Sequence, residues 1–266
     1  MQLSMFDNPA DDRTTAISWT NHTWNPVHGC SRVSEGCRNC YAERLSLKRG
    51  WTEAPWTGPN AAQNVRLMPH KLTEPRKWKE PARVFVNSMS DLFHELIPDT
   101  YLYQVFDVME AAEHLTFQVL TKRPKRAALW QRWPANVWMG TSIEDARAIH
   151  RLDDLRSCGA AVKFVSAEPL IGPWPVQVDL SGFAWLIVGG ESGEGRRPMP
   201  HAWARHIRDL CTDQNVAYFF KQSSAYRTEL GTSLRHEDGT FWVWQQYPGQ
   251  LTPPQPAEPH RYHHDE

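Results

Sequence analysis

Three of the five cysteines in the chain, Cys30, Cys37 and Cys40, lie within eleven residues and have the spacing C-x6-C-x2-C. Three thiols so close in the sequence cannot all pair with one another in disulfides, and exposed thiols without a ligand would be prone to oxidation. Thiolates are ligands of structural zinc and of iron–sulfur clusters. The spacing therefore predicts a metal-binding loop.

Two kinds of metal centre fit such a loop. Structural zinc takes four ligands, so zinc would need a fourth one here, and His28 and His22 are the nearest candidates. A [4Fe–4S] cluster held by three thiolates instead leaves one iron open to a non-protein ligand, which is a reactive arrangement. The remaining cysteines, Cys158 and Cys211, fall in helix-like stretches, and we expect them to be ordinary buried thiols.

Short apolar runs bounded by turn residues alternate with helix-like segments along the chain. The predicted strands are 17–24, 83–86, 116–120, 137–139, 162–165, 185–188 and 217–220, and the predicted helices are 99–113, 125–132, 142–157 and 200–214. Such alternation is typical of parallel strands joined by crossover helices. With six or seven units it favours an α/β fold of the TIM type, a full or partial (β/α) barrel.

The domain organisation follows from the same patterns. We expect one barrel domain over residues 17–247, which places the cysteine loop directly after the first strand. An N-terminal extension covers 1–16, and an insert rich in Pro and Trp lies at about 50–82. The tail over 248–266 has lost apolar periodicity and gained proline, so it is predicted to be disordered.

Polar residues follow the predicted strands at the edge where parallel barrels place their chemistry. In chain order they are Ser88, Ser90, Asp91, Lys122, Arg123, Ser142, Glu144, Glu168, Glu191, Arg196, Arg197 and Lys221. Ser142 can instead cap the helix that follows it. Lys122 and Arg123 do not suit a helix N-terminus, which repels cations, and they favour an anionic or polar ligand. The two cationic pairs, Lys122 with Arg123 and Arg196 with Arg197, could instead be solvated surface charges or partners in ion pairs.

Six motifs in chain order carry a family resemblance over about residues 17–221: TWNPVHGCSRVSEGCRNCYAERL, VFVNSMSDLFHE, FQVLTKRP, WMGTSIE, FVSAEPLIGP and IVGGESGEGRRPM. With them the chain resembles the phage gene-product 37/68-like family, a domain of unknown function with a three-cysteine motif that looks related to radical S-adenosylmethionine (SAM) enzymes. The usual loop of those enzymes is C-x3-C-x2-C with an aromatic residue before the last cysteine. Here the first gap is six residues, and Asn39 takes the place of the aromatic residue.

The resemblance implies that Cys30, Cys37 and Cys40 ligate three irons of a [4Fe–4S] cluster while SAM chelates the fourth. An electron from the cluster would cleave SAM to methionine and a 5'-deoxyadenosyl radical, which abstracts hydrogen from a substrate. The candidates for SAM binding are Ser88, Ser90 and Asp91 at the methionine end and Ser142 and Glu144 at the ribose. The candidates for catalysis are Glu168, Lys122 and Glu191, and those for substrate binding are Arg123, Arg196 and Arg197.

The phage resemblance and the cationic pairs make a nucleic acid or nucleotide the candidate substrate, because cationic side chains bind phosphates. An electron donor is the second expected partner. Two other functions are compatible with the sequence: a zinc-binding, nucleic-acid-binding phage protein without catalysis, and an iron–sulfur redox protein that does not use SAM.

Net charge and hydropathy restrict the partners. The formal net charge of -1 excludes a protein coated in basic residues, so any contact with nucleic acid must be local. The N-terminus lacks the basic and apolar runs of a signal peptide, and no stretch approaches the roughly 18 apolar residues of a membrane span. We therefore expect a cytoplasmic protein without membrane contact.

Overall fold

The computed structural model describes residues 14–227 and 230–258, which leaves most of the predicted extension over 1–16 outside the described residues. The chain divides into two compact units, where the sequence predicts one domain over 17–247. We call residues 14–141 and 153–162 the cysteine-loop unit. The C-terminal unit contains residues 142–152 and the described residues from 163 onward.

Four parallel strands form the sheet of the cysteine-loop unit. They are β1 (His22–Trp24), β4 (Ala82–Val86), β5 (Leu115–Thr121) and β6 (Val137–Ser142), and they pair in this order. Every residue of β4 is buried, Arg83 included, as expected for a central strand of a parallel sheet. Because the strands are parallel, the residues that follow β4 and β5 meet at one edge of the sheet.

Two helices connect these strands. α3 (Asp99–Ala111) buries Leu102, Val105, Phe106 and Met109, which recur every three or four residues and therefore form one apolar stripe. α4 (Pro124–Leu129) begins on a proline, whose fixed φ suits the first helical position.

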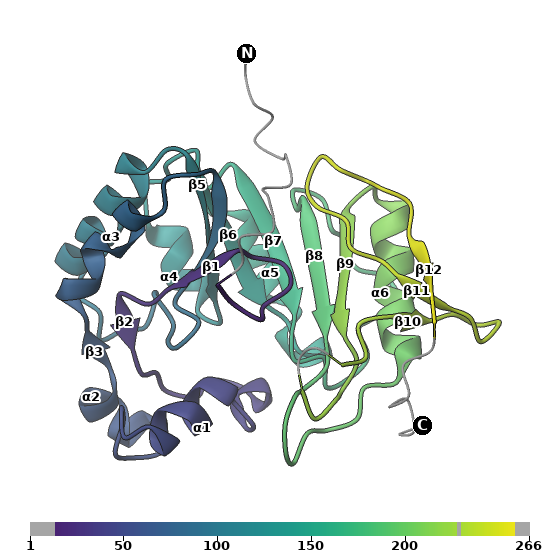
Figure 1. The fold of residues 1–266 in the computed structure, drawn as a ribbon, viewed down its shortest axis with the longest axis horizontal. Helices are drawn as coiled ribbons and strands as arrows, with labels where there is room; N and C mark the ends of the chain where they lie inside the picture. Colours follow the sequence, from purple (N-terminus) through teal and green to yellow (C-terminus); the bar gives the residue numbers. More distant parts are fainter. Residues whose placement is uncertain (1–13, 228–229, 259–266) are drawn as a thin grey trace. The chain divides into compact units, whose positions relative to one another are not determined.

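The predicted insert is largely structured and packs with the cysteine loop. β2 (Val27–His28) pairs antiparallel with β3 (Arg66–Leu67), and between them lie α1 (Tyr41–Lys48) and α2 (Ala61–Asn64). A 3-10 segment, Pro69–Lys77, follows β3. Figure 1 shows α1, α2, β2 and β3 grouped together in the cysteine-loop unit.

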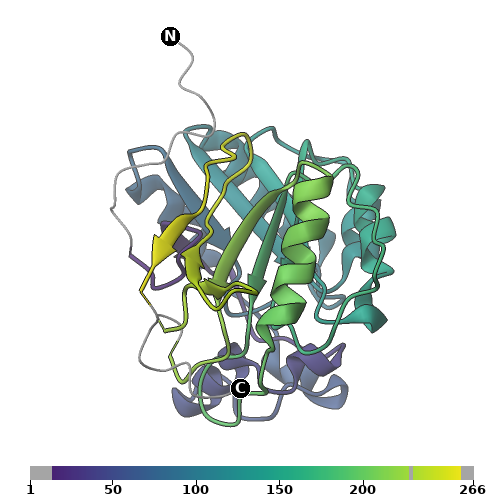
Figure 2. The same cartoon turned by 90° about the vertical axis from the view of Figure 1, so that its right-hand side faces the viewer.

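The C-terminal unit contains three further parallel strands, β7 (Val162–Ala167), β8 (Trp185–Gly189) and β9 (Ala217–Gln222). α6 (His201–Asp213) packs against β9, as Figure 2 shows. A small antiparallel sheet follows, made of β10 (Leu234–Arg235), β11 (Phe241–Val243) and β12 (Gln255–Ala257). The sequence predicts disorder where β12 forms, and residues 259–266 of that tail lie outside the described residues.

The strand order of the seven-stranded sheet is β1-β4-β5-β6-β7-β8-β9, which follows the sequence. This mixed α/β architecture confirms the predicted class, since sequentially ordered parallel strands are consistent with a partial (β/α) barrel. The predicted helix over 142–157 is wrong in part. Ser142 ends β6, and Ile143 N–H donates to Ser166 O at 2.9 Å, so the backbone stays extended there. Only a 3-10 turn, Ala146–Ala148, and α5 (Arg151–Arg156) are helical.

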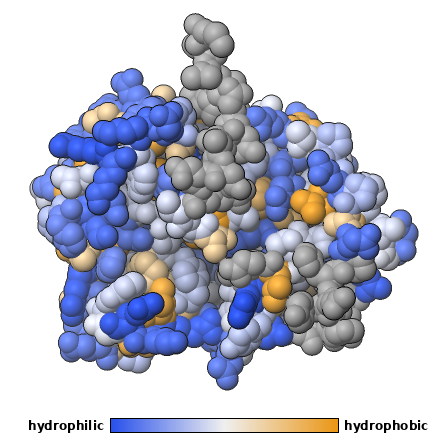
Figure 3. Space-filling model, in the orientation of Figure 1, coloured by the Kyte–Doolittle hydropathy of each residue, from blue (hydrophilic) through white to orange (hydrophobic). Residues whose placement is uncertain are grey.

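No helix among the described residues is both long enough and apolar enough to cross a membrane. The face in Figure 3 is largely hydrophilic, and its hydrophobic residues occur in small separate groups.

Candidate functional site

Gly29 sets the path of the cysteine loop as it leaves β2. Its φ of +79° lies in the left-handed region, and an added Cβ atom would lie 1.9 Å from the carbonyl oxygen of Asn64 in α2. Only glycine tolerates both conditions. Its N–H donates to Met89 O at 3.1 Å, so the loop begins beside the segment that follows β4.

The three thiols of the loop are free and half-buried. Cys30 and Cys40 pack against a small apolar cluster formed by Ala42, Trp56 and Met89. Cys40 occupies the N-cap position of α1, where backbone N–H groups face its thiol. The loop therefore places at least two sulfur atoms at the edge of an apolar patch, with the positive end of a helix beside one of them.

Burial dominates the protonation of these thiols. It raises the pKa of Cys30 to about 12, with the Asp91 carboxylate adding to the rise and the Arg123 guanidinium opposing it. Burial also raises the pKa of Cys40, which the N–H groups of α1 and the cation of Lys122 oppose. Without a metal both thiols are protonated at neutral pH, so binding of a metal would release their protons.

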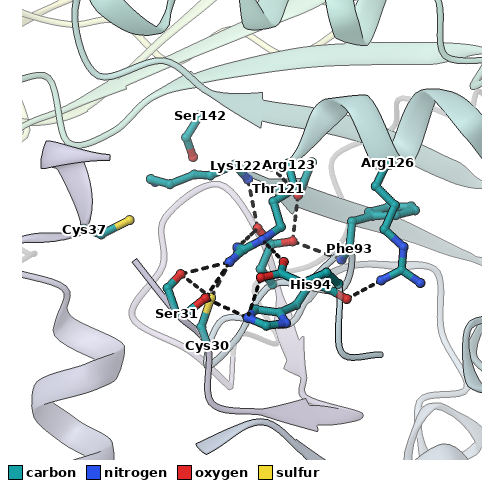
Figure 4. Close-up of polar contacts among 12 residues, drawn as sticks. Cys30, Ser31, Cys37, Phe93, His94, Thr121, Lys122, Arg123, Arg126 and Ser142 are labelled. Carbon is teal, nitrogen blue, oxygen red and sulfur yellow. Dashed lines mark hydrogen bonds and ion pairs between the residues drawn. The ribbon is translucent and has the colours of Figure 1, made fainter. Parts of the chain in front are cut away.

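The three sulfur atoms are not gathered around a common point. Among residues 14–227 and 230–258, no three His, Cys, Asp or Glu side chains are placed to hold a metal ion. Cys37 is near enough to Cys30 and Cys40 to influence the pKa of each, yet Figure 4 shows it apart from Cys30. The donor set thus has the right chemistry for a three-thiolate cluster, and a change of the loop over 30–40 would be needed to assemble it.

The two histidines that the sequence nominates as a fourth zinc ligand have other contacts. The His22 ring stacks on Trp78 with centroids 4.7 Å apart, and its Nδ1 lies 2.9 Å from the Thr14 hydroxyl. The His28 ring lies 5.4 Å from that of Trp51. Both rings thus have aromatic neighbours, and neither belongs to a group of three possible metal ligands among the residues that the structure describes.

An ion pair between an exposed arginine and a buried glutamate connects the cysteine loop to α1. Arg32 donates to both carboxylate oxygens of Glu43, from Nε at 2.9 Å and from Nη2 at 2.7 Å. Glu43 is 3% exposed, and it also accepts the Trp56 N–H at 2.9 Å. Such two-pronged pairing fixes the orientation of both side chains. It ties the segment between Cys30 and Cys37 to α1.

Asp91 and Arg123 make most of the polar contacts at the carboxyl ends of β4 and β5. Figure 4 shows Arg123 beside Ser31 and Cys30 of the cysteine loop. Asp91 accepts from the Thr121 hydroxyl at 2.6 Å and from the Phe93 and Lys122 N–H groups, each at 3.0 Å. Arg123 donates to Asp91 at 3.2 Å and to Glu95 at 2.8 Å. The predicted meeting of these strand ends therefore occurs, with Thr121 as a member that sequence reasoning missed.

The same guanidinium reaches the cysteine loop. Arg123 donates to the Cys30 sulfur at 3.6 Å and to both oxygens of Ser31 at 3.0 Å. Its donors are thus committed to five protein acceptors, although the sequence predicts that it binds substrate. The geometry gives Arg123 a role in positioning Cys30.

His94 completes this arrangement, although nothing in the sequence pattern nominated it. It is fully buried, its Nδ1 accepts the Leu96 N–H at 3.1 Å, and its Nε2 lies 2.8 Å from the Ser31 hydroxyl. The neutral ring must therefore carry its proton on Nε2 and donate it to Ser31. Burial, followed by the charge of Arg123, lowers the pKa of His94, which favours this neutral form.

The two serines predicted to bind the methionine end of SAM donate their hydroxyl protons within the protein. Ser88 donates to Asn25 at 3.2 Å and Ser90 donates to Val27 O at 2.8 Å. The hydroxyl group of the exposed Tyr41 side chain donates a hydrogen bond to Ser88 O at 2.7 Å. These contacts fasten the segment after β4 to the segment around β2, and each serine hydroxyl keeps lone pairs that can accept.

Glu168 and Lys221 meet in the C-terminal unit. The Lys221 ammonium lies 2.8 Å from one carboxylate oxygen of Glu168, and the Ser166 hydroxyl donates to the other at 3.1 Å. A Cβ atom on Gly189 would lie 2.6 Å from that carboxylate, so the glycine leaves room for it. Both charged side chains are 15% exposed. The Lys221 ammonium, a proton donor, and the Glu168 carboxylate, a proton acceptor, are therefore in contact at the carboxyl ends of β9 and β7.

The remaining predicted site residues of this unit form two further pairs. Glu144 accepts from Arg151 at 2.9 Å, and the same guanidinium donates to Ser142 O at 2.7 Å. Glu191 accepts from the N–H and Nε of Arg197 at 2.8 and 3.1 Å. Arg196 is half-buried in the same loop. These residues lie at or after the ends of β6 and β8, as expected, but the sequence did not reveal that the acids are paired with arginines.

A protein-family model described as "Protein of unknown function (DUF5131)" matches residues 14–248. The matched range contains the cysteine loop and every strand-end pair described above. Searches of curated proteins and of solved structures found no significant match.

Proposed function

The chain belongs to the DUF5131 family, whose function is unknown, and we propose that it is a radical SAM-like iron–sulfur enzyme. The observation that carries the proposal is the set of three free thiols on one loop, placed beside the polar carboxyl ends of β4 and β5. With Cys30, Cys37 and Cys40 as ligands, a [4Fe–4S] cluster would supply the electron that cleaves SAM into methionine and a 5'-deoxyadenosyl radical.

Neighbouring cations support thiolate ligation at this loop. Arg123 donates to the Cys30 sulfur, and the charge of Lys122 acts on Cys40. Hydrogen bonds from charged donors stabilise the anionic form of a ligand, and they also orient it. Asp91 and Glu95 hold the guanidinium of Arg123 in place, so they act on Cys30 through it.

The residues proposed for SAM lie at two positions. Ser88 and Ser90 follow β4 and can accept hydrogen bonds from the amino group of the methionine end, because their own protons are donated within the protein. Glu144, paired with Arg151, is the candidate for the ribose hydroxyls together with Ser142.

Acid–base residues for the substrate come from the other strand ends. Glu168 and Lys221 form a largely buried pair that can accept a proton at the carboxylate and supply one from the ammonium. Glu191, with Arg197, and Lys122 are the further candidates for catalysis. A nucleic acid or nucleotide remains the proposed substrate, with Arg196 as a candidate phosphate ligand.

The test is anaerobic purification followed by iron, sulfide and zinc analysis, with EPR spectra of the dithionite-reduced protein before and after SAM is added. We expect about four irons and four sulfides per chain and a spectrum that changes with SAM. Cys37→Ala should lose the iron. Cys158→Ala is the matched control, because this thiol is buried outside the loop and should not affect it.

Each contrary result points to one alternative. Stoichiometric zinc without iron would replace the proposal by a zinc-binding, nucleic-acid-binding protein without catalysis. A cluster whose spectrum does not respond to SAM, with no 5'-deoxyadenosine formed, would indicate a redox protein instead.

A further inference from the structure

Positive charge is concentrated in the segment that contains the cysteine loop and the insert. Residues 30–79 contain ten Lys and Arg but only four Asp and Glu, a formal charge of +6 in a chain whose net charge is -1. The rest of the chain is therefore acidic, at -7. Such an asymmetry creates a local positive potential that attracts polyanions although the whole protein is nearly neutral.

Much of this charge is exposed, in contrast to the arginines at the strand ends. Arg123 and Arg197 are held by buried carboxylates, which leaves them poorly placed to meet phosphates. Arg66, Arg76 and Lys77 are exposed, and none of them has a carboxylate partner among the described residues. The structure thus moves the candidate phosphate-binding surface from the strand ends to β3 and the 3-10 segment Pro69–Lys77.

The same segment also contains an exposed aromatic side chain, Trp51. Trp51 is 40% exposed, and its ring lies 5.4 Å from that of His28. His28 is also the register partner of Arg66 in the pairing of β2 with β3. A half-exposed indole and exposed guanidinium groups in one segment supply a stacking surface and phosphate ligands, which are the two elements of single-strand binding.

We propose that this exposed basic segment, which includes Trp51, Arg66, Arg76 and Lys77, binds single-stranded nucleic acid. The cations contact the phosphate backbone, and an unpaired base stacks on Trp51. The inference rests on the proposed function for the view that this nucleic acid is the substrate, and it names that substrate as single-stranded. Backbone contacts and stacking do not depend on base identity, so binding is tolerant of sequence.

The experiment measures binding of fluorescent single-stranded DNA, single-stranded RNA and duplex DNA to the full chain at a series of salt concentrations. We expect the single strands to bind more tightly than the duplex, with a negative slope of log affinity against log salt. The double substitution Arg66→Gln with Lys77→Gln should reduce that slope by about two, one per lost phosphate contact. Trp51→Ala should weaken single-strand binding roughly 5- to 150-fold, and Trp51→Phe should retain most of it.

A matched control removes two charges elsewhere. Lys125→Gln with Arg227→Gln changes exposed basic residues outside the segment and should leave the slope unchanged. An equal effect of both double variants, or no salt dependence, would overturn the proposal, as would tighter binding of the duplex. The affinity for single-stranded DNA relative to that for single-stranded RNA shows which of the two nucleic acids the protein prefers. Binding needs neither iron nor SAM, so its failure is distinct from failure of the metal analysis.

Discussion

Replacing Arg123 by methionine tests whether its guanidinium holds the strand ends and the cysteine loop together. The substitution keeps a long apolar stem but removes the contacts to Asp91, Glu95, Ser31 and Cys30. The side chain of Asp91 is 8% exposed, so its charge would lose its main counter-ion in a nearly dry site.

The expected cost follows from what Asp91 retains. Breaking a buried ion pair by removing one partner typically costs about 3–5 kcal/mol. Asp91 keeps the Thr121 hydroxyl and two backbone N–H donors, and the exposed Glu95 contributes little. We therefore expect the lower end, about 3 kcal/mol, which corresponds to a fall in Tm of about 6–12 °C for a chain of this size.

Thermal unfolding monitored by circular dichroism measures this fall. Arg132→Met is the control, because Arg132 pairs with the exposed acids Asp107 and Glu110, and it should unfold close to the wild type. In the double variant Arg123→Met with Asp91→Asn, the orphaned charge is gone, so part of the lost stability should return. The reasoning fails if Arg123→Met is no less stable than Arg132→Met, or if the second substitution makes the protein still less stable.

Two further predictions concern separate parts of the chain. Gly29→Ala should lower the urea midpoint of unfolding far more than Gly50→Ala. Both glycines have a positive φ, but only at Gly29 would the new Cβ atom meet a backbone oxygen, at 1.9 Å. Equal effects of the two substitutions would contradict this steric argument. Burial, then the charge of Arg208, lowers the pKa of His236 in the folded state. The unfolded chain therefore binds a proton at this histidine at a higher pH than the folded chain, and stability should fall as the pH drops below about 6.5. His236→Gln should flatten the dependence of the unfolding free energy on pH, measured between pH 7.5 and 5.5. An unchanged dependence would exclude this histidine as the cause.

The sequence predicted those parts of the fold that depend on local periodicity. The apolar stripe of α3 has a helical period, and the runs of β4 and β8 have the short length and the β-branched and aromatic content typical of strands. The region after Ser142 was mispredicted because polar residues there resemble a helix start, while long-range backbone pairing with Ser166 keeps it extended. β12 was missed since a proline-rich composition does not reveal pairing with β11.

The candidate site shows a similar division. Parallel topology predicted that Asp91 and Arg123 would share one edge. The acceptors of Arg123 could not be predicted, because Ser31 lies 92 residues away in the sequence. His94 was missed for the same reason, since its contact with Ser31 spans 63 residues.

The span between Cys30 and Arg123 has a consequence for biosynthesis. During translation the cysteine leaves the ribosome 93 residues before the arginine that contacts it. At roughly 5–20 residues per second this interval lasts about 5–20 s. For that time the three thiols lie on a chain that lacks β5 and the guanidinium, so the nascent loop meets metal or oxidant without the contacts that later hold Cys30 in place.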